Sequence, residues 1–260
     1  MPEATLESPA RAAAAAAAQT AMQRLARRTR GFDARVAHAE ALLREAADDH
    51  AGRIVQVTSL GVEGMVLTDM LARLQLPVAV ATIDTGALHA ETLALIDRIP
   101  ARYGIEVEVF RPQAEAVLQF LGRHGAHAMR TSVELRRACC ALRKLEPMQR
   151  LLAGRSAWVS GLRREQGATR SEVPFFALQD DGRERFCPLA DWSEADVWEY
   201  VRRHDPPTNP LHDHGYPSIG CAPCTRAVAA GEDARAGRWW WEQGEAKECG
   251  LHLRAAWTTA

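Results

Sequence analysis

The chain has 260 residues, of which 47% are hydrophobic and 25% charged, and its formal net charge at pH 7 is −1. This length is sufficient for one large domain with a well-buried core. The 32 basic and 33 acidic residues nearly balance, which excludes a general attraction for nucleic acid or an anionic membrane. No apolar run approaches the ~20 residues of a membrane helix. We therefore expect a cytoplasmic protein that binds neither nucleic acid nor membrane.

The first 30 residues are rich in alanine and arginine and contain few large apolar side chains that would dock them on a core. We predict that residues 1–30 form a poorly ordered extension. An organelle transit peptide is the alternative, but Glu3 and Glu7 count against it. One α/β domain is expected over residues 31–240, followed by a tail over residues 241–260.

Hydrophobic periodicity predicts helices that alternate with strands along the chain. The expected helices are 33–48, 65–74, 89–103 and 134–152, and the expected strands are 53–58, 78–83, 106–110 and 156–160. This alternation indicates a parallel sheet covered on both faces. Ligands of such sheets bind beyond the carboxyl ends of the strands. A further helix is expected after Ser193, which opens a motif typical of a capped helix start.

Two short loops follow predicted strands at that edge. The segment 59–64 (SLGVEG) joins a strand to a helix, where backbone N–H groups and the helix N-terminus favour an anion. It lacks the Gly-Lys-Ser/Thr of a Walker A loop. Asp84-Thr85-Gly86 follows Ile83 at the end of the second strand. Taken alone, the first loop is equally well explained as an ordinary turn, and the second is better explained by helix capping.

Arginines gather in two further segments. The segment 161–170 follows the fourth predicted strand and contains two glycines. Its arginines are Arg163, Arg164 and Arg170. Arginine forks match sulfate and phosphate oxygens in pairs, so we favour an anion site over the more usual solvated charged face. Arg235 and Arg238 lie beside three consecutive tryptophans, which core packing alone would explain. Together with Arg226, these arginines are instead candidates for a second anion clamp that meets Cys249.

The six cysteines include two pairs that are far apart in the sequence. Cys139 and Cys140 are adjacent, and Cys221 and Cys224 form a C-x-x-C motif. Four thiolates can bind an iron–sulfur cluster or, less often, a zinc ion. Two adjacent cysteines are poorly suited as ligands of a zinc ion. A buried pair without metal is the simpler alternative, but the C-x-x-C motif favours a metal site. Lys144, one helical turn beyond Cys140, would offset the negative charge of a thiolate-bound cluster.

Cys249 lies alone near the C-terminus, and its surroundings suit a nucleophile better than a ligand. An ordinary cysteine, with a pKa of ~8.5, is only a few per cent thiolate at neutral pH. Lys247 and His252 would raise that fraction if they lie close. The alternative is an exposed cysteine without a role. Cys187 has no partner pattern and is predicted to be a small core residue.

Together these motifs closely resemble the assimilatory adenylyl-sulfate reductases, within the wider adenylyl-sulfate and phosphoadenylyl-sulfate reductase family. The resemblance spans about residues 55–252, and its most specific motif is Glu-Cys-Gly-Leu-His at 248–252. The two cysteine pairs mark the cluster-bearing branch, which mostly uses adenylyl sulfate. The chain departs from the family at Leu60, where an aromatic residue is common, and at Cys187, where asparagine is common.

The resemblance implies a parallel-sheet PP-loop α/β fold, of the adenine nucleotide alpha hydrolase type, with a C-terminal catalytic tail. It also implies one [4Fe–4S] cluster, with Lys144 beside it. The implied cluster ligands are Cys139, Cys140, Cys221 and Cys224. The residues expected around the substrate are Ser59, Leu60, Gly61, Ile83, Thr85, Arg163, Arg164, Arg170, Arg235 and Arg238.

The resemblance further implies a thioredoxin-dependent reaction in which Cys249 and His252 are the catalytic residues. The Cys249 thiolate attacks the sulfur of adenylyl sulfate and AMP leaves. Reduced thioredoxin or glutaredoxin then releases sulfite from the S-sulfocysteine. We also expect a homo-oligomer.

Three alternatives stay open. The nearest is a phosphoadenylyl-sulfate reductase or a dual-specificity enzyme. The second is an adenylating tRNA sulfurtransferase, whose Ser-Gly-Gly-x-Asp-Ser loop is not matched at Leu60 or at Glu63-Gly64. The neutral net charge also counts against tRNA binding. The third is a cluster-bearing redox sensor, which would leave Cys249 without a role.

Overall fold

The computed structural model describes residues 19–229 and 231–242. Its centre is a six-stranded sheet with the strand order β3-β2-β1-β4-β6-β5. Neighbouring strands run parallel from β3 to β6, and β5 pairs antiparallel with β6. The strands are β1 (Ile54–Thr58), β2 (Ala79–Ile83), β3 (Val107–Phe110), β4 (Ala157–Val159), β5 (Phe176–Leu178) and β6 (Glu184–Phe186). The prediction of a parallel-sheet α/β fold is confirmed.

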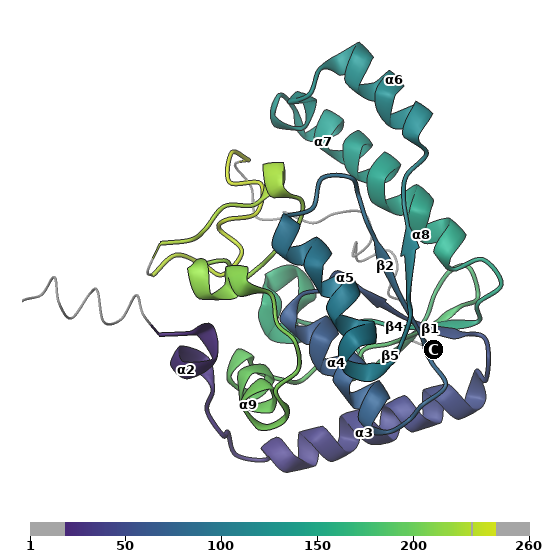
Figure 1. Ribbon diagram of the computed structural model, residues 1–260, viewed down its shortest axis with the longest axis vertical. Coiled ribbons are helices and arrows are strands. Elements are labelled where there is room, and N and C mark those ends of the chain that lie inside the picture. Colours follow the sequence, from purple (N-terminus) through teal and green to yellow (C-terminus); the bar gives the residue numbers. More distant parts are fainter. Residues whose placement is uncertain (1–18, 230, 243–260) are drawn as a thin grey trace, which may run out of the picture.

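Helices cover both faces of this sheet (Figure 1). They are α2 (Ala21–Leu25), α3 (Phe32–Asp49), α4 (Val62–Arg73), α5 (Ala90–Tyr103), α6 (Ala114–His124), α7 (Val133–Cys140), α8 (Glu146–Leu151) and α9 (Glu194–His204). Successive strand residues point to opposite faces. Ile54 and Val159 pack with α3, α4 and α9, whereas Val55 and Trp158 pack with α8. Both faces are therefore buried, as a parallel sheet requires.

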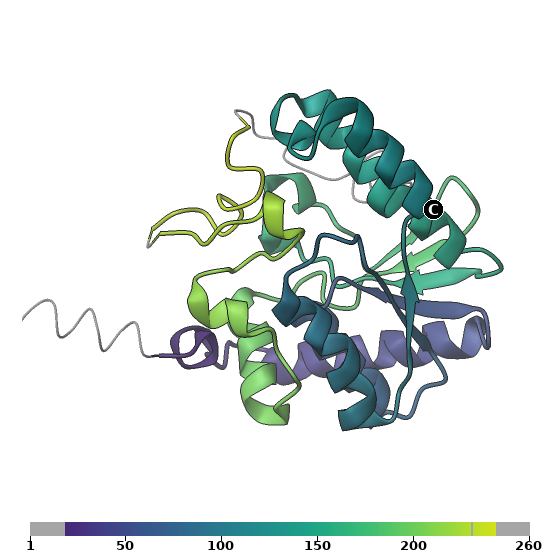
Figure 2. The same cartoon turned by 45° about the horizontal axis from the view of Figure 1, so that its top comes forward.

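The helix expected over 134–152 is divided into three parts. After α7 ends at Cys140, the chain forms a π-helical turn, Ala141–Leu145, before α8 begins at Glu146. A π-helical turn is rare and often lies at a functional site. It lies next to the adjacent cysteines and carries Lys144. In Figures 1 and 2 the yellow-green segment around residues 220–242 lies beside α7, which brings the second cysteine pair toward the first.

The described part of the N-terminal extension packs on the domain. Helix α2 contacts α9, and Ala21 is 1% exposed. The Ala21 N–H donates a hydrogen bond of 2.6 Å to Asp213. We expected residues 1–30 to be poorly ordered, and residues 19–30 instead have defined contacts. Residues 1–18 lie outside the described residues. Within residues 19–229 and 231–242, no helix combines the length and apolar character needed to span a membrane.

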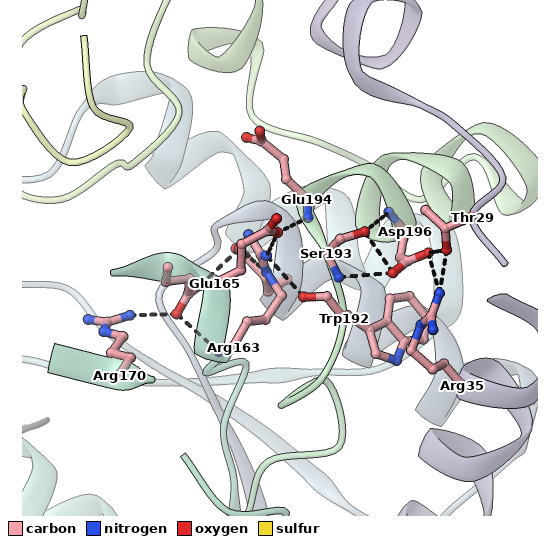
Figure 3. A network of polar contacts seen from close by, with 11 residues as sticks. Thr29, Arg35, Arg163, Glu165, Arg170, Trp192, Ser193, Glu194 and Asp196 are labelled. Carbon is pink, nitrogen blue, oxygen red and sulfur yellow. Dashed lines mark hydrogen bonds and ion pairs between the residues drawn. The ribbon is translucent and has the colours of Figure 1, made fainter. Parts of the chain in front are cut away.

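Asp196 joins this N-terminal segment to the start of α9, as Figure 3 shows. Its carboxylate accepts hydrogen bonds from the Ser193 N–H at 2.9 Å and the Ser193 hydroxyl at 2.7 Å. It also accepts from Thr29 and, at 3.0 Å, from Arg35. Burial raises the pKa of Asp196, but these hydrogen bonds together hold it below its ordinary value. The ionised carboxylate therefore stabilises the fold.

We expect Asp196→Asn to lower the free energy of unfolding by about 1–3 kcal/mol at pH 7, because buried donors lose a charged acceptor. Because the pKa of Asp196 is lower in the folded state, its carboxylate contributes fully to stability at pH values above the unfolded-state pKa of about 3.9. This contribution is lost as the pH falls through the folded-state pKa. The difference from the wild type should therefore narrow below about pH 4. Urea unfolding at several pH values measures it, with exposed Asp48→Asn as the control. A difference that does not change with pH would contradict this assignment.

Candidate active site

A cavity of about 390 Å³ lies at the carboxyl ends of β1, β2 and β4. Thr58, Ile83 and Ser160, which end or follow these strands, form part of its wall. This is the edge at which parallel sheets bind their ligands. We refer to it below as the strand-end cavity.

Most of the residues predicted around a substrate line the strand-end cavity. They are Ser59, Gly61, Ile83, Thr85, Arg163, Arg170, Arg235 and Arg238. These residues come from four separate stretches of sequence that only the fold brings together. Cys249 and His252, the predicted catalytic residues, lie outside the described residues.

Leu60 has its side chain in the core rather than in the cavity wall. It is fully buried and packs with Met65, Leu95 and Ile99. Its backbone is left-handed, with φ of 60°, and its N–H donates to the Thr58 hydroxyl at 2.9 Å. Burial of a leucine is worth about 1.5–3 kcal/mol, which offsets the ~1–2 kcal/mol cost of that backbone conformation. The expectation that the Leu60 side chain lines the nucleotide pocket therefore needs correction.

Arg164 is also directed elsewhere. Its Nε donates to the Val173 carbonyl at 2.8 Å, and its guanidinium lies 5.0 Å from the centre of the Phe175 ring. These contacts belong to the small cluster around Cys187, which is fully buried with Leu162 and Val173. These contacts direct the Arg164 guanidinium away from the strand-end cavity, so they do not support the predicted role at an anion site. Cys187 is a small core residue, as predicted.

Arg163 lines the cavity, but its charge is already paired. Its guanidinium contacts Glu63 at 2.9 Å and Glu165 at 3.0 Å, as part of the network in Figure 3. Burial raises the pKa of Glu63, but Arg163 and Gln166 outweigh that effect and lower it. Arg163 therefore stabilises the loop 59–64 against the loop 161–170, rather than offering a free cation to a ligand.

Gln166 connects this pair to Arg170. Its Nε2 donates to Glu63 at 2.9 Å, and its Oε1 accepts from the Arg163 N–H at 3.1 Å and from Arg170 at 2.6 Å. Because both ends of the amide are engaged, its orientation is fixed. Neither Gln166 nor Glu63 was predicted from the sequence to have a role. Their only sequence signal was their place within the two loops.

A second cavity, of about 190 Å³, is lined by all four paired cysteines, and we call it the cysteine cavity. Cys139, Cys140, Cys221 and Cys224 are each 7–8% exposed and pack in one buried cluster with Met129 and Trp239. Ala222 donates its N–H to the Ala87 carbonyl at 2.8 Å, which holds the C-x-x-C motif beside the loop after β2. The two pairs thus converge in space.

Cations surround these thiols. Arg136, Arg143 and Lys144 line the same cavity, and Arg143 donates to the Thr85 carbonyl at 2.6 Å. Burial and, after it, the neighbouring Cys221 and Cys140 raise the pKa of the Cys224 thiol to about 12. A bound metal group would deprotonate such thiols, and the cations would offset the resulting negative charge.

The shape of the cysteine cavity bears on what it can hold. Among residues 19–229 and 231–242, no three His, Cys, Asp or Glu side chains are grouped so as to hold a metal ion. The cysteines instead surround a volume of about 190 Å³. One water needs about 15 Å³, so this space admits a group of several atoms. Four thiols around such a space match the donor set of a multi-atom cluster.

The two cavities share a wall. Lys144, Cys221 and Trp239 line both of them. Arg238 lies 4.8 Å from the centre of the Trp239 ring and donates to the Ile219 carbonyl at 3.3 Å. The strand-end cavity therefore has Lys144 and Arg238 at the side that faces the cysteines. Such a cation-lined recess suits an anion carrying phosphate or sulfate.

Comparison with known proteins agrees with this geometry. Residues 53–227 match the model of the phosphoadenosine phosphosulfate reductase domain. The chain is 54% identical over 204 residues to the adenosine 5′-phosphosulfate reductase of Allochromatium vinosum, covering 77% of this chain and 79% of that protein. It is 50% identical over 222 residues to the enzyme of the same name from Burkholderia cepacia, covering 85% and 88%.

Solved structures have the same fold. The phosphate complex of the phosphoadenylyl-sulfate reductase of Candida auris superposes with a TM-score of 0.61 at 28% identity, over 71% of this chain and 88% of that one. An FMN adenylyltransferase of Candida glabrata superposes with a TM-score of 0.53 at 15% identity, over 92% and 84%. The second likeness concerns the fold alone. Both agree with a PP-loop nucleotide-binding architecture.

We expect Gly220→Ala to weaken the binding of a phosphate-bearing nucleotide such as AMP about tenfold, the loss of roughly one charged hydrogen bond. A Cβ at this position would lie 2.4 Å from Nη2 of Arg238 and would displace that guanidinium from the wall. The end of a flexible side chain moves at low cost, so the melting temperature should change little. Isothermal titration measures the affinity. Gly122→Ala, where a Cβ meets nothing within 4 Å, is the control. Equal affinities would show that Arg238 takes no part in binding.

Proposed function

The chain belongs to the phosphoadenosine phosphosulfate reductase family, and from this membership we propose that it reduces adenylyl sulfate to sulfite and AMP. The proposal depends on one observation above all, the wall that the strand-end cavity shares with the cysteine cavity. Relatives at 50–54% identity carry the name adenosine 5′-phosphosulfate reductase. The domain and Candida auris names instead mention the 3′-phosphorylated substrate, so that nucleotide is the second candidate.

Adenylyl sulfate is negatively charged at both its phosphate and its sulfate. We place the nucleotide between the loop after β1 and the end of β2, against Gly61 and Ile83. The sulfate end then lies toward Lys144 and Arg238 at the shared wall. Arg170 and Arg235 line the same cavity and would neutralise the phosphate as it departs.

In the first step the Cys249 thiolate attacks the sulfur of adenylyl sulfate. A sulfur–sulfur bond forms, the bond from sulfur to the bridging phosphate oxygen breaks, and AMP leaves with that electron pair. The sulfonate remains on Cys249 as S-sulfocysteine. We assign His252 to assist this step. A covalent intermediate divides a difficult reduction into two displacements.

In the second step a dithiol protein, reduced thioredoxin or glutaredoxin, attacks Sγ of Cys249. Sulfite leaves with the electron pair of the sulfur–sulfur bond, and a mixed disulfide forms. The second thiol of the reductant resolves that disulfide and restores the Cys249 thiol. The net result is one sulfite and one oxidised dithiol per adenylyl sulfate.

We propose that the four paired cysteines hold one [4Fe–4S] cluster in the cysteine cavity. The donor set, the volume and the surrounding cations support this. When bound, the cluster would supply an electrostatic and structural influence at the shared wall. Lys144 lines both cavities, so its ammonium group offsets charge on the cluster side and attracts the sulfate on the other.

We expect a mass increase of one sulfonate group, mapped to Cys249, when the reduced enzyme is mixed with adenylyl sulfate. Intact mass spectrometry followed by peptide mapping measures it. Cys249→Ser should abolish both the adduct and sulfite formation, while the cluster absorbance stays. An adduct on another cysteine, or turnover by the serine variant, would refute the proposed nucleophile. Parallel assays with the 3′-phosphorylated nucleotide decide between the two substrates, and a preference for it would replace the first choice.

We expect Cys221→Ser to lose the cluster, because one of the four thiolate ligands is missing. Iron and acid-labile sulfide content, together with visible absorbance, measure the loss. Cys187→Ala is the matched control, since it also removes a buried thiol but lies in a separate cluster. Its iron content should stay near that of the wild type. Full iron and sulfide in Cys221→Ser would rule out the proposed ligand set.

A further inference from the structure

Arg136, on the helix that carries the first cysteine pair, binds Glu242 at the end of the described chain. We propose that this pair is an anchor that holds residues 239–242 against α7, beside the cysteine cavity and the shared wall that Trp239 forms. By doing so it sets the point from which the following residues reach the substrate. The inference deepens the proposed function and depends on it for the role of Cys249. Arg136 and Glu242 are thus positioning residues, since they act through others.

The contact between the two side chains is bidentate and buried. Nε of Arg136 lies 2.7 Å from one carboxylate oxygen of Glu242, and Nη2 lies 2.9 Å from the other. The two side chains are 2% and 9% exposed. A fork-to-fork pair of this kind fixes orientation as well as distance. Replacement of a buried ion pair by apolar groups is often neutral for stability, so specificity of position is the better explanation for this one.

The same guanidinium also contacts Trp239. Cζ of Arg136 lies 4.6 Å from the centre of the Trp239 ring, and Cζ of Arg238 lies 4.8 Å from it. Trp239 is 1% exposed, and its backbone N–H donates to the Cys224 carbonyl at 3.2 Å. A continuous set of contacts therefore runs from α7 through Trp239 to Arg238 in the strand-end cavity. The anchor is therefore connected, through Trp239, to the wall that the two cavities share.

A second group of contacts holds the next two residues. Arg130 lies 5.1 Å from the ring of Trp240 and 5.4 Å from that of Trp241, and donates to the Pro223 carbonyl at 3.0 Å. The Glu242 N–H donates to the Trp239 carbonyl at 2.9 Å, which closes a turn. Residues 239–242 are thus held to α7 and its neighbouring turn by side chains and backbone together.

The position of this anchor matters because of chain length. Cys249 lies seven residues beyond Glu242. An extended chain covers at most ~3.6 Å per residue, so Cys249 cannot be farther than about 25 Å from the anchor. Arg136 lines the cysteine cavity and contacts Trp239, which lines both cavities, so the chain beyond Glu242 starts close to the shared wall. If Glu242 were released, Cys249 could reach a larger volume, and the effective concentration of its thiol near the sulfate would fall.

The test is Glu242→Gln, which keeps the shape of the side chain and removes its charge. We expect the single-turnover rate of adduct formation on Cys249, at saturating adenylyl sulfate, to fall about 10- to 100-fold, as misplacement of a reacting group does. AMP affinity and iron content should stay near those of the wild type. Acrylamide should quench tryptophan fluorescence more strongly, which reports on residues 239–241 independently of turnover.

Glu232→Gln is the matched control, since Glu232 forms a similar bidentate pair with Arg226 in the same segment, but on the exposed surface. It should behave as the wild type. A double variant, Arg136→Met with Glu242→Met, covers the case in which an unpaired buried arginine impairs folding. It should fold, and its rate of adduct formation, expressed per iron-loaded enzyme, should stay low.

The outcomes separate this inference from the proposed function. A wild type that forms no adduct would refute the proposed function, while the quenching result would still decide whether the anchor holds residues 239–241. If Glu242→Gln forms the adduct at the wild-type rate and quenching is unchanged, the anchor is refuted. If the double variant regains the wild-type adduct rate, the pair has only a structural role and the inference is also refuted.

Discussion

The contact between the loop after β2 and the C-x-x-C segment is the constraint on which the rest of the site depends. The Thr85 hydroxyl lies 3.2 Å from Sγ of Cys221, and a backbone hydrogen bond joins Ala87 to Ala222. Thr85 lies at the carboxyl edge of the sheet, where it lines the strand-end cavity, whereas Cys221 lines the cysteine cavity as well. Because they touch, a ligand at the strand ends lies next to the four thiols.

Charge is distributed unevenly around that contact. The chain as a whole is nearly neutral, yet Arg136, Arg143 and Lys144 line the cysteine cavity, and Arg238 lies on the other side of the shared wall. Buried cations need nearby negative groups. Glu242 supplies one inside the protein, while thiolates and an anionic substrate are the proposed partners of the others. The site is therefore built to gather negative charge in a small volume.

Individual members of a motif do not all have the same role. The sequence placed Leu60, Arg163 and Arg164 in one substrate site, and the fold assigns each a different environment. Leu60 packs in the core, Arg163 is paired with Glu63, and Arg164 stacks on Phe175. For Leu60 and Arg163 the competing contacts include residues distant in sequence, Leu95 and Glu63 respectively. For Arg164 the competing contact is with Phe175, only 11 residues away. Local spacing cannot reveal such pairings, because backbone direction decides which way a side chain points.

The sequence by itself determined the α/β class, because alternating hydrophobic periods depend on local geometry alone. It also predicted the candidate functional groups, namely four paired cysteines, an arginine-rich loop and a separate thiol at Cys249. Only the tertiary structure decided that the two cysteine pairs meet, that Lys144 and Trp239 separate two cavities, and that Glu242 is held by Arg136. These pairings join residues about 80 to 110 positions apart. Their formation depends on which surfaces pack together, and that information is spread over the whole core.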